Sequence, residues 1–153
     1  MAQVRRLGTG DLATLRAINA LFAAAFEDHA SYSAHSPPDA YLMRLLGREQ
    51  FVALIAEQDG AVVGALVGYE LEKFEQARSE FYIYDLAVAQ SARRQGIATD
   101  LIAHLAEIAQ KRGASVIFVQ ADYDDPPAIA LYAKLGTREE VLHFDIAVKA
   151  PLR

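Results

Sequence analysis

Cysteine is absent from this chain of 153 residues. Its absence excludes disulfides, thiolate metal ligands and a cysteine nucleophile. The four histidines include no pair with metal-ligand spacing, so we expect no metal site. No apolar run is long enough to cross a membrane, and the first residues lack the apolar stretch of a signal peptide. We therefore expect a cytoplasmic protein with no membrane partner.

The chain also lacks an excess of basic residues. Its net charge of −5 argues against a nucleic-acid partner. Acidic residues gather between Asp122 and Asp145, where the only opposing cations are Lys134 and Arg138. Such a segment suits a cationic substrate, although an ordinary solvated surface has the same composition.

The length and the hydrophobic fraction of 53% predict one globular domain with a sizeable core. Apolar periodicity predicts an α/β fold with a mixed, mostly antiparallel central sheet flanked by helices. The predicted strands cover residues 4–7, 51–57, 61–71, 79–88, 115–121 and 138–148. The predicted helices cover residues 11–26, 38–46, 96–111 and 128–135, and residues 27–38 are expected to form a loop. Gly64 and Gly68 mark points where the third strand bends or is closely approached.

The first motif follows the apolar strand that ends at Val88. A short polar link leads to Arg93-Arg-Gln-Gly-Ile-Ala98, and a long amphipathic helix begins there. A helix N-terminus offers unpaired N–H groups and a favourable dipole to an anion, and Gly96 lets a phosphate approach the backbone. Taken alone the motif also fits an ordinary strand-to-helix connection. The three glycines of a dinucleotide fold and the lysine of a P-loop are absent, so the motif indicates another phosphorylated cofactor.

The second motif is Pro127-Ala-Ile-Ala-Leu-Tyr-Ala-Lys-Leu-Gly136, which follows a buried strand and an acidic loop. With both motifs in this order, the chain resembles the GNAT superfamily of acetyl-CoA-dependent N-acetyltransferases. Residues 73–88, 119–123 and 138–145 and the Tyr32-Ser-x-His35 loop further resemble type I aminoglycoside 3-N-acetyltransferases.

The resemblance implies a single GNAT domain over residues 1–153, acting as a homodimer. It implies transfer of acetyl from acetyl-CoA to the 3-amino group of gentamicin- or sisomicin-type aminoglycosides, and hence antibiotic resistance. Because the chain has no cysteine, the amine is expected to attack the thioester directly. Two rival functions remain. One is acetylation of another polyamine, amino sugar or protein amine, and the other is acyl-CoA binding without catalysis.

The resemblance also assigns residues to the cofactor. The strand edge at Leu86, Ala87 and Val88 is expected to hydrogen-bond the pantetheine arm in a strand-like way. The pyrophosphate is expected to lie against the segment Arg93, Arg94, Gln95, Gly96, Ile97, Ala98 and Thr99. The two arginines add charge-assisted contacts, unless they are simply part of a solvated loop.

Asp85 is the candidate general base, or the carboxylate that orients the amine. It lies in an otherwise apolar strand, where burial raises a carboxyl pKa, although a purely structural carboxylate fits the same pattern. Glu80, acting through a water, is the alternative base. Tyr132 is the candidate acid toward the leaving sulfur, as the family pattern implies; it could instead be a core aromatic.

A polycationic acceptor needs several carboxylates. Glu80, Asp122, Asp125 and Asp145 are the predicted binding residues, and Tyr32 is expected to cover a sugar ring.

Overall fold

The structure is a computed structural model that describes residues 1–149. The chain divides into two compact units, Met1–Gln120 and a second unit that begins at Ala121. We describe each unit by itself, and the single domain expected over residues 1–153 stays a prediction. Among the described residues, no helix has the length and apolar character that a bilayer crossing requires.

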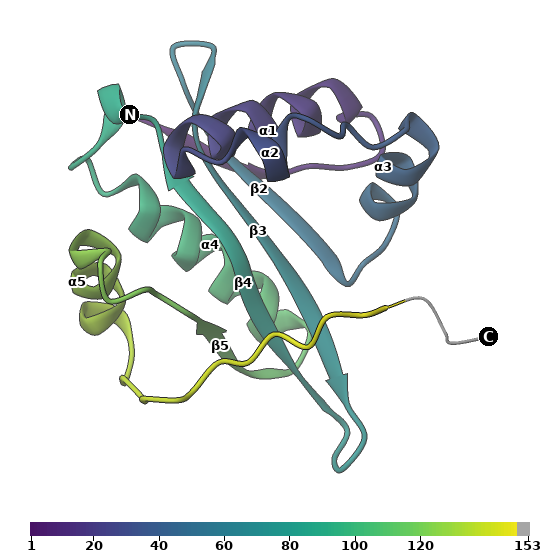
Figure 1. Cartoon of the computed structure of the whole chain (residues 1–153), viewed down its shortest axis with the longest axis vertical. Coiled ribbons are helices and arrows are strands. Elements are labelled where there is room, and N and C mark those ends of the chain that lie inside the picture. Colours follow the sequence, from purple (N-terminus) through teal and green to yellow (C-terminus); the bar gives the residue numbers. More distant parts are fainter. Residues whose placement is uncertain (150–153) are drawn as a thin grey trace. The chain divides into compact units, whose positions relative to one another are not determined.

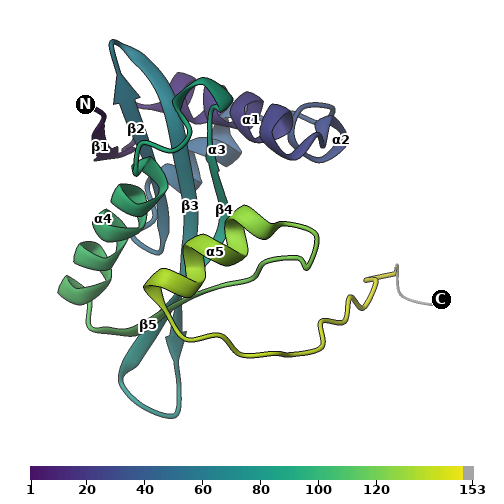
Figure 2. The same cartoon turned by 90° about the vertical axis from the view of Figure 1, so that its left-hand side faces the viewer.

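The first unit is a five-stranded sheet with helices on both faces (Figures 1 and 2). Its elements are β1 (Gln3–Arg6), α1 (Leu12–Phe26), α2 (His29–Tyr32), α3 (Asp39–Leu46), β2 (Phe51–Gln58), β3 (Ala61–Lys73), β4 (Arg78–Val88), a 3₁₀ turn (Gln90–Ala92), α4 (Ile97–Lys111) and β5 (Ala114–Val119). The strands lie in sequence order, antiparallel from β1 to β4, and β5 is parallel to β4. This confirms the mixed, mostly antiparallel sheet.

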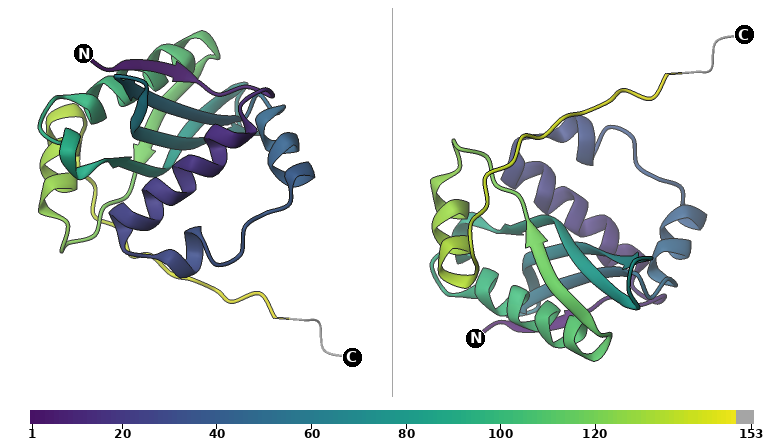
Figure 3. Two further views of the ribbon diagram at one scale, coloured as in Figure 1. Left: turned by 90° about the horizontal axis from the view of Figure 1, so that it is seen from above. Right: turned by 90° about the horizontal axis from the view of Figure 1, so that it is seen from below.

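Each face of the sheet has its own apolar core. On one face α1 packs Ile18 and Phe22 onto the strands, and on the other α4 packs Leu101 and Leu105. Views from above and below show α1 and α4 on opposite sides of the sheet (Figure 3). Gly64 allows α4 to come close, because a Cβ there would lie only 2.9 Å from Ile97 Cγ2. The close approach predicted at this glycine is confirmed.

A β-bulge in β4 changes which residues face which helix. Val67 pairs with Asp85 and the next residue of β3, Gly68, pairs with Ile83, so Tyr84 has no partner. Side chains alternate between faces along a strand, and one extra residue reverses the alternation beyond it. Ile83 accordingly packs in the α4 core, whereas Ala87 packs in the α1 core. The bulge therefore turns Asp85 away from the α4 core and onto the α1 face.

A buried ion pair links the sheet to the C-terminal end of α4. The Glu70 side chain is only 3% exposed and accepts hydrogen bonds from Arg112 and from the Ser79 hydroxyl, at 2.7 Å each. Burial alone would raise the pKa of Glu70, but these hydrogen bonds and the charges of Arg112 and Arg6 lower it below its usual range. Glu70 is therefore held as a carboxylate.

The second unit contains one helix, α5 (Pro126–Leu135), among its described residues. Asp125 caps this helix by accepting a hydrogen bond from the Ala128 amide at 3.3 Å. The strand predicted over residues 138–148 is wrong, because residues 137–149 form no ladder. Their apolar residues do alternate, at Leu142, Phe144 and Ile146, and these side chains are exposed. Alternation specifies a face for a strand, but a strand also needs a hydrogen-bonding neighbour, which this pattern does not supply.

Candidate active site

Asp85 is the most deeply placed carboxylate of the predicted site. It is 9% exposed on β4 and accepts a hydrogen bond from the Tyr32 hydroxyl. Tyr32 lies on α2, far from β4 in the sequence. The structure therefore brings two of the predicted site residues together, Tyr32 from helix α2 and Asp85 from strand β4.

The position of Tyr32 depends on the N-terminal cap of helix α2. Residues 27–38 were predicted to be a loop, but α2 forms there because Asp28 caps it, accepting from the Ser31 amide at 3.1 Å. The Tyr32 ring then packs on Phe22 and Phe26 of α1, with centroid distances of 5.8 and 5.5 Å. The Tyr32 ring therefore lies against α1, and its hydroxyl points toward the sheet.

Burial sets the protonation of this pair. It raises the pKa of Asp85, and the hydrogen bond from Tyr32 partly opposes that rise. Burial, followed by the Asp85 carboxylate, raises the pKa of Tyr32 far above that of an ordinary phenol. The phenol stays neutral and donates, and Asp85 remains the acceptor. A carboxylate in this setting holds a cation strongly and accepts a proton more readily than an exposed one.

The edge of β4 beyond Ile83 is open. The ladder with β5 covers Ser79 to Ile83 only. From Asp85 to Val88, β4 pairs with β3 and with no other strand of the described residues. The predicted pantetheine-binding residues Leu86, Ala87 and Val88 thus lie on a free strand edge, next to Asp85, which is where strand-like pairing with a ligand is possible.

The segment that follows has the backbone of an anion cradle. Arg94 and Gly96 both have left-handed backbone conformations, with φ of 63° and 77°. No side chain caps the N-terminus of α4 at Gly96, and a Cβ at Gly96 would meet nothing within 4 Å. The first-turn N–H groups of α4 thus have no side-chain cap, and such groups can donate to an anion. Arg93 ties the segment to β4 by donating to the Val88 carbonyl at 3.3 Å.

Glu80 lies on the α1 face of β4 as well, but at a distance from Asp85. Because of the bulge, their partners on β3, Leu71 and Val67, are only four positions apart, which is about 13 Å at about 3.3 Å per residue. A single amine can therefore approach only one of them directly, and the choice between Asp85 and Glu80 as the base stays a prediction.

Sequence reasoning missed a row of aromatic side chains on this face. Tyr69, Tyr82 and Tyr84 contact one another in turn, and Tyr82 stacks on Phe118 of β5 with a centroid distance of 4.6 Å. The alternation of Glu80, Tyr82 and Tyr84 along one strand was a signal for a common face, and the bulge adds Asp85 to it.

The remaining predicted residues belong to the second unit. Tyr132 is half-buried on α5, and burial, followed by the Asp125 charge, raises the pKa of its hydroxyl. Asp125 is the helix cap, Asp122 is exposed, and Asp145 contacts His143 at 2.9 Å. Their predicted contacts with an acceptor, and the role of Tyr132, stay predictions.

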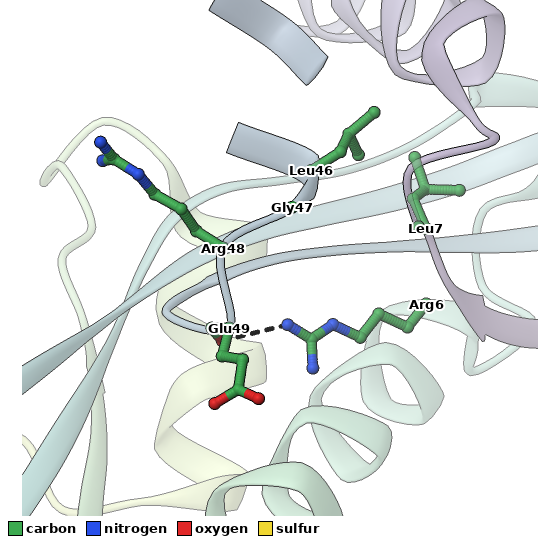
Figure 4. Close-up of a pocket in the computed structure, with 7 residues that line it drawn as sticks. Arg6, Leu7, Leu46, Gly47, Arg48 and Glu49 are labelled. Atoms are coloured by element: carbon green, nitrogen blue, oxygen red, sulfur yellow. Dashed lines mark hydrogen bonds between the residues drawn. The ribbon is translucent and has the colours of Figure 1, made fainter. Parts of the chain in front are cut away.

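A hollow of about 360 Å³ lies elsewhere in the first unit, lined by residues of the β1–α1 and α3–β2 connections, among them Leu7 and Gly47 (Figure 4). The Arg6 guanidinium is already engaged there, donating to the carbonyls of Glu49 and Phe51 at 3.0 Å each. No predicted site residue lines this hollow. Among residues 1–149, no group of three or more His, Asp or Glu side chains is placed to hold a metal ion.

Three comparisons with known proteins bear on the fold and the site. The sequence profile of the acetyltransferase (GNAT) family matches residues 15–137. An aminoglycoside acetyltransferase, HMB0005, from an uncultured soil metagenomic sample is 54% identical, with a TM-score of 0.95 and coverage of 97% of this chain and 99% of that one. The aminoglycoside acetyltransferase meta-AAC0020, also from an uncultured soil metagenomic sample and in complex with sisomicin, is 30% identical, with a TM-score of 0.83 and 97% of each chain covered.

An uncharacterized N-acetyltransferase of Bacillus subtilis (strain 168), YhfO, is 27% identical over 149 residues, which are 96% of this chain and 98% of the relative. The family profile spans most of the chain, and the soil relative with 54% identity matches it almost from end to end. The free β4 edge and the uncapped α4 N-terminus suit the acyl donor of such enzymes. The chain therefore belongs to the GNAT family of acetyltransferases.

Proposed function

We propose that this protein transfers acetyl from acetyl-CoA to the 3-amino group of a 2-deoxystreptamine aminoglycoside of the gentamicin and sisomicin type. The observation that carries the chemistry is the buried Asp85 carboxylate beside a free strand edge. The acceptor class is supported by the likeness to two aminoglycoside acetyltransferases, one of them a complex with sisomicin.

Acetyl-CoA, the acyl donor of GNAT enzymes, fits the residues present. The free edge of β4 at Leu86 to Val88 offers backbone groups to the amide-bearing pantetheine arm. The pyrophosphate would accept hydrogen bonds from the first-turn amides of α4, with Arg93 and Arg94 adding positive charge. The open space at Gly96 is where a phosphate can come against the backbone.

Substitution of Gly96 by alanine tests this cradle. Gly96 and Gly113 lie at opposite ends of α4, both with φ of +77° and open space around them. Alanine at either position costs about 1–2 kcal/mol of backbone strain. We expect only Gly96→Ala to raise the KM for acetyl-CoA, by about tenfold (an interaction loss of about 1.4 kcal/mol), because only there does the methyl group take the place of the phosphate. Steady-state kinetics of both variants give the answer, and equal KM values would place the pyrophosphate elsewhere.

The reaction at Asp85 is a proton transfer and an acyl transfer. The acceptor arrives as an ammonium ion, and Asp85 takes its proton or orients it for loss to water. The free amine nitrogen then attacks the thioester carbonyl carbon. The new C–N bond forms, the C–S bond breaks, and the sulfur leaves as a thiolate that takes up a proton. The acylated nitrogen loses one proton to solvent, so that the products are an N-acetyl amide and CoA thiol. We assign the neutral Tyr132 hydroxyl as the donor of the proton that the thiolate takes up.

Replacing Tyr132 by phenylalanine tests the acid role. Loss of a positioned general acid lowers kcat by about 10²-fold or more, whereas loss of a packing hydroxyl does not. We expect kcat to fall by about this factor with the KM for gentamicin nearly unchanged. Unchanged kcat would mean that the thiolate leaves without help from Tyr132. Tyr123→Phe, an exposed tyrosine in the same unit, is the control.

The other carboxylates serve the additional amino groups of the acceptor. An aminoglycoside carries several ammonium groups at separate ring positions, so Glu80, Asp122, Asp125 and Asp145 are assigned to binding and not to catalysis. Carboxylates that solvent can reach act mainly by attracting the cation and fixing its orientation.

The test of the function is release of free CoA from acetyl-CoA in the presence of single acceptors. Gentamicin and sisomicin represent the proposed class, and spermidine and a peptide amine represent the rival acceptors. We expect turnover with the first two and mass-spectrometric addition of one acetyl group at the 3-amino position. Turnover with spermidine or the peptide alone would replace the acceptor, and no turnover with any amine would favour an acyl-CoA-binding module. Expression in a susceptible bacterium, with growth on gentamicin as the readout, tests resistance.

A further inference from the structure

The α1 face of the sheet carries a row of aromatic rings that the assigned chemistry leaves unused. The row starts at Phe51 of β2 and passes through Tyr69 of β3 to Tyr84 and Tyr82 of β4. Adjacent ring centroids are 5.5 to 6.2 Å apart, and Phe118 on β5 completes the row. The rings thus cross four neighbouring strands.

The exposure of these rings argues against a packing role. Phe51, at the inner end, is 6% exposed, but Tyr69 and Tyr84 are 37% and 65% exposed. Contiguous exposed aromatic surface is uncommon on a soluble protein and marks a binding surface. The bulge at Tyr84 contributes directly, because it leaves this tyrosine without a ladder partner on β3.

Carboxylates stand at both ends of the β4 part of the row. Asp85 follows Tyr84 and shares its face because of the bulge, and Glu80 lies two residues before Tyr82 on that face. Burial, followed by the charge of Asp85, raises the pKa of Tyr69. Burial also raises the pKa of Tyr82, followed by the charges of Tyr84 and Asp85. The phenols of Tyr69 and Tyr82 are therefore neutral π surfaces in the field of a carboxylate.

We propose that Tyr69, Tyr82 and Tyr84 form a platform that binds an ammonium-bearing sugar ring of the acceptor. One ring of the acceptor lies across the aromatic faces with its ammonium group at Asp85, and an ammonium group on another ring of the same acceptor reaches toward Glu80. Ring faces attract cations, and tyrosine rings also cover the apolar C–H face of a sugar. This inference rests on the proposed function, and it names which part of the site selects amino sugars over linear polyamines.

Two substitutions at Tyr84 separate the ring from its hydroxyl. Tyr84→Leu removes the π face, and we expect the dissociation constant of gentamicin, measured by calorimetry, to rise about 5- to 30-fold. Tyr84→Phe keeps the face and is expected to stay within about twofold of the wild type, as cation–π attraction needs no hydroxyl. Phe74→Leu is the matched control, because Phe74 is 101% exposed at the β3–β4 turn, outside the row. The KM for acetyl-CoA should be the same in all three variants.

The outcomes distinguish this inference from the function on which it rests. Normal gentamicin affinity in Tyr84→Leu, or a loss in Tyr84→Phe as large as in Tyr84→Leu, would overturn the platform while the wild type still acetylates gentamicin. A wild type that neither binds nor acetylates gentamicin would overturn the proposed function, and the platform with it. A selective loss in Tyr84→Leu supports both.

Discussion

Replacing Asp85 by asparagine is expected to lower kcat for gentamicin by about 10²- to 10⁴-fold, the usual contribution of a general base. Asparagine keeps the size of the side chain and its hydrogen bond with Tyr32 but cannot take a proton. The KM for acetyl-CoA should change little, because the donor is assigned to the backbone of β4 and α4. Steady-state kinetics with each substrate varied in turn measure both effects.

The corresponding change of a carboxylate to an amide at Glu80 is the control. Glu80→Gln removes a carboxylate from the same strand and face, and we expect it to change the KM for gentamicin more than kcat. A near-normal rate in Asp85→Asn would remove Asp85 from the base role. A large kcat loss in Glu80→Gln, with Asp85→Asn unaffected, would transfer that role to Glu80.

The pH profile provides a second readout of Asp85. Burial raises its pKa above the ordinary aspartate value, and only the deprotonated form accepts a proton. The acid limb of kcat/KM should therefore lie above about pH 4, where an exposed aspartate titrates. Tyr32→Phe removes the hydrogen bond that lowers this pKa, so the limb should move to higher pH. A limb at the ordinary aspartate value in both proteins would contradict the assignment.

The shifted pKa also has a cost in stability. For a carboxyl group whose folded pKa lies above its unfolded value, the folded state is favoured below the unfolded pKa. That advantage is lost as pH rises through the folded value. At neutral pH the Asp85→Asn protein should consequently be at least as stable as the wild type, which makes the loss of rate a test of chemistry and not of folding.

Removal of Arg112 is expected to have the largest effect on stability. Arg112→Met removes the ion-pair partner of Glu70, whose side chain is 3% exposed, and leaves it only the charge of Arg6 nearby. Breaking such buried pairs costs about 3–5 kcal/mol. Urea unfolding at neutral pH gives the change in free energy. Arg78→Met is the matched control, because Arg78 pairs with Glu75 where both side chains are about one third exposed, and it should cost less than about 1 kcal/mol.

The direction of the Glu70 pKa adds a pH dependence. A carboxyl group whose folded pKa is lowered contributes stability above its unfolded pKa, and that contribution is lost as pH falls through the folded value. The difference between the wild type and Arg112→Met should accordingly shrink as the pH falls below about 4, where glutamate titrates in unfolded chains. A constant difference down to pH 2 would mean that Arg112 stabilises α4 by packing and not through the charge of Glu70.

Much of the first unit follows from periodicity alone. The apolar spacing of α1 and α4 and the apolar periodicity of the central strands predicted the sheet and its helices. Part of the candidate site could also be predicted from the sequence, because a carboxylate inside an apolar strand and a glycine at a helix N-terminus are local signals. Asp85 and Gly96 are both found in settings that suit the chemistry assigned to them.

The rest depends on relations between segments that are distant in sequence. The hydrogen bond between Tyr32 and Asp85 requires α2, whose four residues are too few for a periodic signal. The aromatic row needs the register of four strands, and no single strand shows it. The prediction of a strand over residues 138–148 was wrong for the same reason, since the alternation of its apolar residues carries no information on a partner strand.

The bulge at Tyr84 makes the site depend on how many residues precede Asp85, and not only on which residues they are. If the pairing of β3 and β4 were regular, the aspartate would face the apolar core under α4 and the aromatic side chains would lose their neighbouring charge. Many individual side chains along β4 can change without disturbing that arrangement. A single inserted or deleted residue would exchange the two faces of the strand, so natural variants of this enzyme should vary here by substitution and keep the length of the strand.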